Sequence, residues 1–195
     1  MTILYDNTAS LSTMTAEEVT EVVALNYKSI WQKNGINPKW GLEELAQDYA
    51  KWYVPRSTNR IITARDSEAA NTMVGAIILM STKESRAVTD EPKLAAWFVD
   101  NDVDIEKCCI PHVFVDLDYQ GTGISTQLFT DMETLAVSLG FEDMILYGVF
   151  PRAFAEWGRD TKYVGRWSAI VDPDGVNIDP IPGDALPHAV RIRLV

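Results

Sequence analysis

The chain has 195 residues, of which 47% are hydrophobic and 23% are charged, a composition typical of a soluble globular domain. Its formal net charge of −11 argues against nucleic-acid binding, because nucleic-acid-binding proteins usually present a basic face. No apolar run approaches the roughly 20 residues of a membrane span, and no basic and apolar signal-peptide pattern opens the chain. We therefore predict one domain over residues 1–195, located in the cytoplasm, with no nucleic-acid or membrane partner.

The first part of the chain predicts two helices followed by a hairpin. Thr15-Ala-Glu-Glu18 is a capping-box sequence, which favours the start of a helix. Two apolar segments further on are separated by a short polar turn and should pair as antiparallel strands. The expected elements are a weak strand in Thr2–Leu11, a helix from Thr15 to Gly35, a helix over Leu42–Tyr53, and strands over Arg60–Arg65 and Met73–Met80.

The second part predicts a strand–helix–strand unit and two further strands. Residues 81–107 are the least periodic stretch, and connections of this length are usually functional or mobile. Strand–helix–strand should form one right-handed parallel crossover, and the other strands can pair antiparallel. The expected elements are strands over Ile110–Val115, Asp143–Phe150, Tyr163–Val171 and His188–Val195, a helix over Ile124–Leu139, and a helix from Pro151 to Gly158.

The sequence offers little for a metal site. Its two cysteines are adjacent and are expected in the core, and it has only two histidines. Acidic residues alternate over Asp100–Asp104, but the glycine and the closing glutamate of a calcium loop are missing. These cysteines and histidines are Cys108, Cys109, His112 and His188. We predict no metal.

Val113–Ser125 is the most informative stretch, because it predicts a strand, a glycine loop and a helix in succession. Apolar residues recur at helical spacing from Ile124 to Leu139, and Gly140 suits a left-handed C-cap. The unpaired N–H groups and the dipole of a helix N-terminus attract anions, and glycines allow close approach. The stretch therefore predicts a phosphate site, with a plain strand-to-helix turn as the alternative.

Residues 115–125 resemble the acyl-CoA signature of the GNAT superfamily of N-acetyltransferases, Val-x-Pro-x-x-(Arg/Gln)-x-x-Gly-x-(Gly/Ala). The order of elements also fits that family over residues 60–171, and more loosely in the two N-terminal helices. The resemblance implies an α/β fold with a mixed, mostly antiparallel sheet of six to seven strands, about four helices and a central parallel strand–helix–strand crossover. The signature matches at Val115, Gln120 and Gly123 and departs at Leu117, in place of proline, and at Ser125, in place of the last small residue.

The same resemblance implies where acetyl-CoA, the expected co-substrate, would bind. Backbone amides of Gly121–Thr126 would hold the pyrophosphate, and the pantetheine arm would extend along Val113–Val115 like an added strand. A backbone N–H near Val115 would polarise the thioester carbonyl. Asp116 and Asp118, in the turn, are interpreted as solvated. The implied cofactor-binding residues are Val113, Phe114, Val115, Gln120, Gly121, Thr122, Gly123, Ile124, Ser125 and Thr126.

The catalytic acid and base are not fixed by the motif. Many family members carry a tyrosine on the helix after the next strand, where this chain has Trp157, whose indole is a poor proton donor. Tyr147 and Tyr163 are the nearest phenols, and His112 lies on the motif strand, although packed core residues would explain all three. We retain Tyr163 and His112 as catalytic candidates.

The predicted function is transfer of an acetyl group from acetyl-CoA to a primary amine, of a small molecule or a peptide, by direct attack in a ternary complex. The alternative is a GNAT-fold module that binds acyl-CoA without efficient turnover, which the missing tyrosine keeps open. Nucleotide binding is weaker, because the Gly-Lys-(Ser/Thr) phosphate loop is absent and a dinucleotide fingerprint would normally open the domain. A homodimer is left open.

Overall fold

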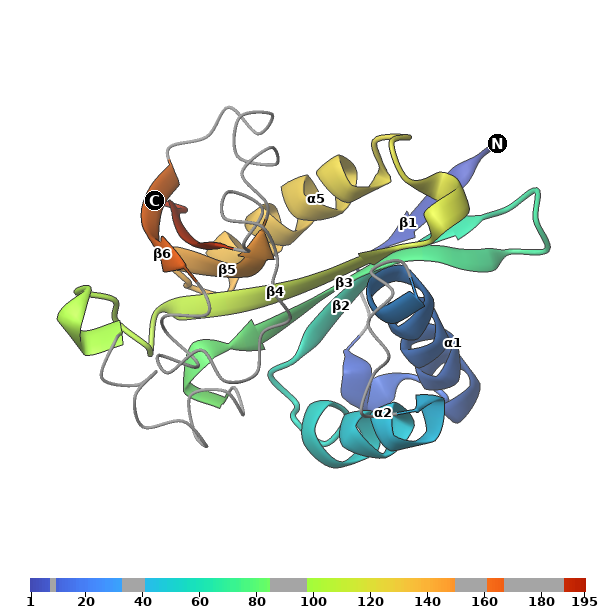
Figure 1. Cartoon of the computed structure of the whole chain (residues 1–195), viewed down its shortest axis with the longest axis horizontal. Coiled ribbons are helices and arrows are strands. Elements are labelled where there is room, and N and C mark those ends of the chain that lie inside the picture. Colours follow the sequence, from blue (N-terminus) through green and yellow to red (C-terminus); the bar gives the residue numbers. More distant parts are fainter. Residues whose placement is uncertain (8–9, 33–40, 85–97, 150–160, 167–187) are drawn as a thin grey trace. The chain divides into compact units, whose positions relative to one another are not determined.

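The computed structural model describes residues 1–7, 10–32, 41–84, 98–149, 161–166 and 188–195 (Figure 1). The chain divides into two compact units. Unit 1 comprises residues 1–80 and 112–135, and unit 2 comprises residues 81–111 and 136–195. Strand β4 (Cys108–Val115) and helix α5 (Ile124–Ser138) contribute residues to both units. The expectation of a single domain stays a prediction.

Unit 1 begins with two helices, both present where the sequence predicts them. The capping box of α1 (Ala16–Asn26) is confirmed, because the Thr15 N–H donates to Glu18 Oε2 at 2.8 Å and the Glu18 N–H donates to Thr15 Oγ1 at 3.2 Å. Each helix then widens into a π-helical turn, which the sequence did not predict. The elements are α1 with the turn η2 (Tyr27–Gln32), and α2 (Leu42–Asp48) with the turn η3 (Tyr49–Tyr53). The predicted end at Gly35 lies outside the described residues.

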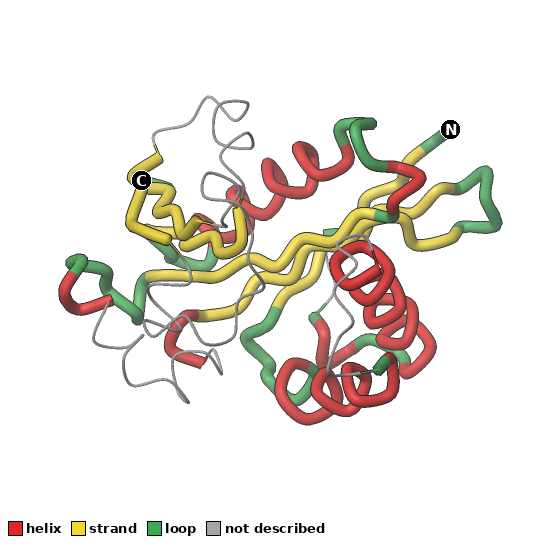
Figure 2. Tube along the Cα trace, viewed as in Figure 1, coloured by secondary structure: helices red, strands yellow, loops and turns green. Residues whose placement is uncertain are grey.

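The strands of unit 1 run in the order β1-β2-β3-β4, drawn as yellow tubes in Figure 2. The predicted hairpin is confirmed, since β2 and β3 pair antiparallel with Ile62 opposite Ile77. The second half of β4 is the next strand of the sheet after β3, and just beyond it the Asp116 N–H donates to the Val74 carbonyl at 2.9 Å. The elements are β1 (Ile3–Asp6), β2 (Arg60–Asp66) and β3 (Thr72–Ser81).

Helix α5 packs on this sheet over a glycine. A Cβ atom built on Gly75 would lie 2.8 Å from Ile124 Cγ2, closer than real Cβ atoms approach, and 3.2 Å from Leu128 Cδ1, a tight contact. The helix therefore reaches the β3 backbone because residue 75 has no side chain. Ile124 and Leu128 are buried, so this contact fixes where the first turn of α5 lies relative to β3. The left-handed cap predicted after the helix is confirmed by a φ of 86° at Gly140.

Unit 2 contains the predicted parallel pairing. The first residues of β4 pair with β5 (Asp143–Val149) through Cys108 opposite Asp143 and Cys109 opposite Met144. Both cysteines are buried and free, as the sequence indicated. Strand β7 (His188–Arg193) then pairs antiparallel with β5 and with β6 (Thr161–Arg166), which gives the order β4-β5-β7-β6. The described strands thus number seven and form the mixed arrangement that was predicted.

Two strands begin two residues earlier than the sequence predicted. Strand β4 begins at Cys108 rather than at Ile110, because the two small apolar cysteines pair with β5. Strand β6 begins at Thr161, two residues before the predicted start. The expected helix from Pro151 to Gly158 and the turn-rich stretch up to residue 187 lie outside the described residues. None of the helices described here is long and apolar enough to cross a membrane.

Candidate functional site

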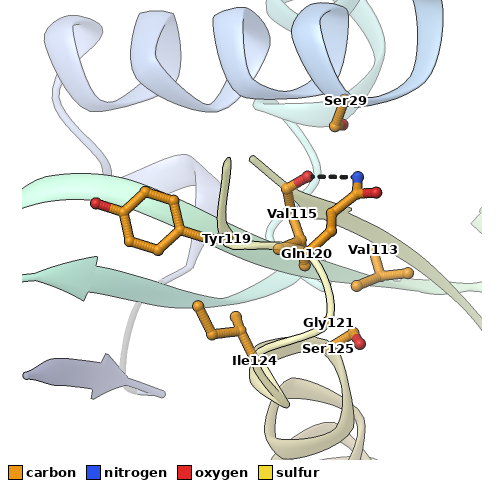
Figure 3. Close-up of a pocket in the computed structure, with 8 residues that line it drawn as sticks. All are labelled: Ser29, Val113, Val115, Tyr119, Gln120, Gly121, Ile124 and Ser125. Carbon is orange, nitrogen blue, oxygen red and sulfur yellow. Dashed lines mark hydrogen bonds between the residues drawn. The ribbon is translucent and has the colours of Figure 1, made fainter. Parts of the chain in front are cut away.

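A pocket of about 320 Å³ opens in unit 1 between β4, the glycine loop and the first turn of α5 (Figure 3). The turn η2 closes it on the side opposite α5. The lining residues come from four successive elements of the motif and from one distant helix turn. They are Ser29, Val113, Val115, Tyr119, Gln120, Gly121, Ile124 and Ser125.

The β4 wall of the pocket presents a strand edge. Because the Asp116 N–H points to β3, strand alternation directs the N–H and C=O groups of Val115 to the opposite edge. The side chains of Val113 and Val115 line the pocket, whereas Phe114 between them is 1% exposed and belongs to the core. This edge can therefore offer backbone hydrogen bonds to an extended ligand.

Gln120 already uses one of these backbone groups. Its Nε2 donates to the Val115 carbonyl oxygen at 3.2 Å, the dashed line in Figure 3. Gln120 comes five residues after Val115, so the chain folds back on itself across a short turn. The side chain thus occupies a position where an amide of a bound ligand would donate.

The loop after β4 is shaped by a short 3₁₀ turn and two glycines. Asp116 caps the turn η5 (Leu117–Tyr119), with its carboxylate accepting the Asp118 N–H at 3.0 Å. Gly121 has a φ of 78° and Gly123 a φ of 89°, values that favour glycine. A Cβ built on either glycine meets nothing within 4 Å, so the space above the loop is open.

Tyr119 ties this loop to the sheet. Its hydroxyl donates to Asp66 Oδ2 at 3.0 Å, and the Thr122 hydroxyl donates to the Tyr119 carbonyl at 2.6 Å. The Glu68 N–H donates to Asp66 Oδ1, which is the main reason that the pKa of Asp66 lies below its usual value. The hydrogen bond to the ionised Asp66 in turn raises the pKa of Tyr119. The tyrosine therefore acts as a neutral donor that positions the loop.

Asp116 is not the solvated carboxylate that the sequence suggested. Its side chain is 16% exposed, and Lys28 Nζ donates to both of its oxygens at 2.8 Å. Asp118 is exposed, and its Oδ2 lies 3.6 Å from the same Lys28 Nζ. The sequence did not reveal the pair, because Lys28 lies on the turn η2, far away along the chain.

The pocket itself is uncharged. None of its eight lining residues carries a formal charge at neutral pH. The first turn of α5 also has no acidic side chain. An anion placed there would be held by the unpaired N–H groups and the dipole of α5, a helix of 15 residues, rather than by basic side chains.

The structure gathers six of the ten predicted cofactor-binding residues around the pocket: Val113, Val115, Gln120, Gly121, Ile124 and Ser125. Phe114 is buried instead, and Thr122, Gly123 and Thr126 are exposed in the same loop and first turn without lining the pocket. Sequence reasoning missed Tyr119, although it lies inside the motif, and Ser29, which no motif indicates. Their roles toward coenzyme A stay predictions.

The two catalytic candidates lie outside the pocket lining. His112 is half-buried, with its ring centroid 6.3 Å from that of Tyr53, and burial lowers its pKa to about 4. Tyr163 lies in β6 and pairs through its backbone with Val190, while its side chain is not described. Trp157 lies outside the described residues. Among those residues, no cluster of three or more His, Cys, Asp or Glu could hold a metal ion.

The mixed sheet with its parallel β4–β5 pair is a GNAT-like α/β fold. Solved structures of N-acetyltransferases match the chain over nearly all of its length. An N-acetyltransferase from Staphylococcus aureus Mu50 has a TM-score of 0.60 at 12% identity and covers 100% of both chains.

Two further solved structures share this fold. A chimera of the spermidine N-acetyltransferase SpeG from Vibrio cholerae and hSSAT has a TM-score of 0.59 at 12% identity, covering 100% of this chain and 96% of that one. The PaiA N-acetyltransferase from Thermoplasma acidophilum, in complex with coenzyme A, has a TM-score of 0.55 at 11% identity and covers 99% of each chain. No protein-family model matches the sequence, and no curated protein matches it. At these identities the likeness shows the fold.

Proposed function

We propose that this chain is an acetyl-CoA-dependent N-acetyltransferase that acts on a primary amine. One observation carries the proposal. A single pocket joins the edge of β4 at Val113 and Val115 to the glycine loop and the first turn of α5. Coenzyme A combines an extended arm rich in amides with a diphosphate. The edge of β4 suits the amide-rich arm, and the glycine loop with the first turn of α5 suits the diphosphate.

The diphosphate would be held by backbone amides of residues 121–126. Both glycines of the loop have positive φ and open space above them, so a phosphate can approach the N–H groups closely. The burial of Ile124 against Gly75 holds the first turn of α5 in place before any ligand arrives. The donors are thus preorganised, which reduces the entropy lost on binding.

The pantetheine arm would lie along the edge of β4. Its amide groups would pair with the backbone of Val113 and Val115 as an additional strand does. Gln120 would then release the Val115 carbonyl that it now holds. The Val115 N–H would face the thioester carbonyl and stabilise the negative charge that develops on its oxygen during attack.

In the proposed reaction, the neutral amine attacks the thioester carbon, the C–S bond breaks, and the acetyl group stays on nitrogen. The nitrogen loses one proton to a base, and the departing thiolate accepts one from an acid. His112 and Tyr163 remain the candidates for these roles. With a pKa of about 4, His112 is uncharged at neutral pH and could accept a proton only as a weak base. The acceptor class, primary amines, is supported by the neighbour whose name specifies spermidine.

Two assays test the proposal. Titration calorimetry should show binding of coenzyme A and acetyl-CoA, and no comparable binding of ATP, which lacks the pantetheine arm. Thiol release from acetyl-CoA should then rise with at least one member of a panel of primary amines, including spermidine and lysine-containing peptides. Absence of coenzyme A binding would refute the site. Tight binding without thiol release from any amine would favour the alternative, an acyl-CoA-binding module.

A further inference from the structure

Two carboxylates lie at the start of a loop that is proposed to bind a polyanion. Asp116 begins the turn η5 and accepts the Asp118 N–H, so it forms part of the loop rather than a neighbour of it. The Asp116 N–H is bonded to Val74, which leaves this carboxylate little freedom to move away. Asp118 follows two residues later. Negative charge at this position opposes the binding of phosphates.

Lys28 is the cation that the described residues place against both carboxylates. Its Nζ lies 2.8 Å from the oxygens of Asp116 and 3.6 Å from Asp118 Oδ2. The hydrogen bond to Asp116 is the main cause of the raised pKa of Lys28, so the lysine is fully charged at neutral pH. Its side chain is 39% exposed, which makes a large contribution to fold stability unexpected.

The lysine also comes from the turn that walls the pocket. Its neighbour Ser29 is buried, lines the pocket and donates to the Asn26 carbonyl at 3.3 Å. Lys28 and Ser29 are adjacent in this π-helical turn, and Ser29 lines the pocket while Lys28 reaches the loop. Such turns are frequent at functional sites.

We propose that Lys28 sets the affinity of the phosphate loop for its ligand by offsetting one of the two negative charges of Asp116 and Asp118. This inference rests on the proposed function, because it assumes that the loop binds the diphosphate of coenzyme A. Lys28 is thus a positioning residue. It contacts the loop carboxylates, and the pocket lining that receives the ligand has no cationic side chain to compensate for its loss.

Four variants separate this electrostatic role from a structural one. Lys28→Met removes the cation, and Lys28→Arg retains it. Asp116→Asn removes one negative charge and keeps an oxygen to accept the Asp118 N–H. The double variant Lys28→Met with Asp116→Asn has the same net charge at the loop as the wild type. Affinity for coenzyme A is measured by calorimetry at low salt, about 20 mM, and at high salt, about 500 mM.

At low salt, Lys28→Met should raise the dissociation constant of coenzyme A about fivefold over that of the wild type. At high salt, the two dissociation constants should differ by less than about twofold. Lys28→Arg and the double variant should both stay within about twofold of wild type. Asp116→Asn alone should bind coenzyme A as tightly as wild type or more tightly. Circular dichroism checks that each variant is folded.

Three results would overturn the inference. They are unchanged affinity in Lys28→Met, a loss that persists at high salt and in the double variant, and weaker binding in Asp116→Asn alone. The last result stays informative even if Lys28→Met does not fold. A wild type that binds no coenzyme A at either salt concentration would instead reject the proposed function, so the two failures are distinguishable.

Discussion

The sharpest test of the site is Gly123→Val, matched with Gly140→Val. Both glycines have similar positive φ angles, 89° and 86°, and a Cβ on either meets nothing within 4 Å. Gly123 immediately precedes α5, with its carbonyl accepting the Gln127 N–H, and Gly140 follows the other end of the same helix. The two substitutions therefore impose the same backbone strain at opposite ends of one element.

The expected loss of stability is similar in both variants. A β-branched residue at positive φ is strongly disfavoured, and holding one there costs about 1–3 kcal/mol. A Cβ at either position meets nothing within 4 Å, so we expect little packing penalty to add to this strain. The unfolding free energies of the two variants should thus agree with each other within about 1 kcal/mol.

The effect on ligand binding should differ between the variants. At position 123 the added methyl groups would occupy the open space above the loop, where we propose that the diphosphate binds. Losing two hydrogen bonds to a charged group, at about 1.5–3 kcal/mol each, corresponds to a loss of affinity of at least about 100-fold. At position 140 no ligand contact is expected, so the affinity for coenzyme A should stay within about twofold of wild type.

Urea unfolding and calorimetry with coenzyme A measure these two quantities on the same preparations. Normal coenzyme A affinity in Gly123→Val would show that the phosphate site lies elsewhere. Equal losses of affinity in both variants would also reject the reasoning, since they would show that general destabilisation, rather than the loop, controls binding.

Three further predictions concern the framework around the site. Gly75→Ala should destabilise the fold by about 1–3 kcal/mol in urea unfolding, because its methyl group would collide with Ile124 and Leu128. The control Gly41→Ala, whose methyl group would meet only the carboxylate end of the Glu44 side chain, should lose less than about 1 kcal/mol. Equal losses in the two variants would contradict the close approach of α5 to β3. His112 has a pKa of about 4 in the fold and about 6.5 in the unfolded chain, so the unfolded chain binds the proton more readily and the unfolding free energy should fall as the pH is lowered through this range. His112→Gln should remove at most about 2 kcal/mol of the fall in unfolding free energy measured between about pH 7 and pH 5. An unchanged pH profile of stability in this variant would contradict burial of the imidazole. Arg191→Leu should lower the unfolding free energy by about 3–5 kcal/mol, because it removes the guanidinium that bonds both oxygens of Asp143 at 2.8 and 2.6 Å, and the Asp143 side chain is only 6% exposed. Adding Asp143→Asn should recover part of this loss of stability. No recovery would show that the unpaired charge is not the cause.

Local signals predicted most of the elements. The capping box at Thr15, the apolar spacing from Ile124 onward and the cap at Gly140 each depend on residues within a few positions, and all three are confirmed. The π-helical turns after α1 and α2 were missed. A π turn has no sequence period of its own, since it arises where packing absorbs an extra residue in a helix.

The sequence by itself determined the backbone part of the site. Strand, glycine loop and helix N-terminus are contiguous in residues 113–125, and their conformations follow from β-branched residues, two glycines and helical periodicity. A motif of this kind indicates its ligand because the N–H groups that would bind it belong to the motif itself.

The tertiary structure alone decided what surrounds that backbone. It placed Ser29 on the pocket wall and brought Lys28 to Asp116, and it turned a carboxylate that seemed solvated into one partner of an ion pair. It also put His112 beside Tyr53 and not in the pocket lining. These contacts join residues far apart in the chain, and long-range packing of side chains leaves no periodic or local trace in a single sequence.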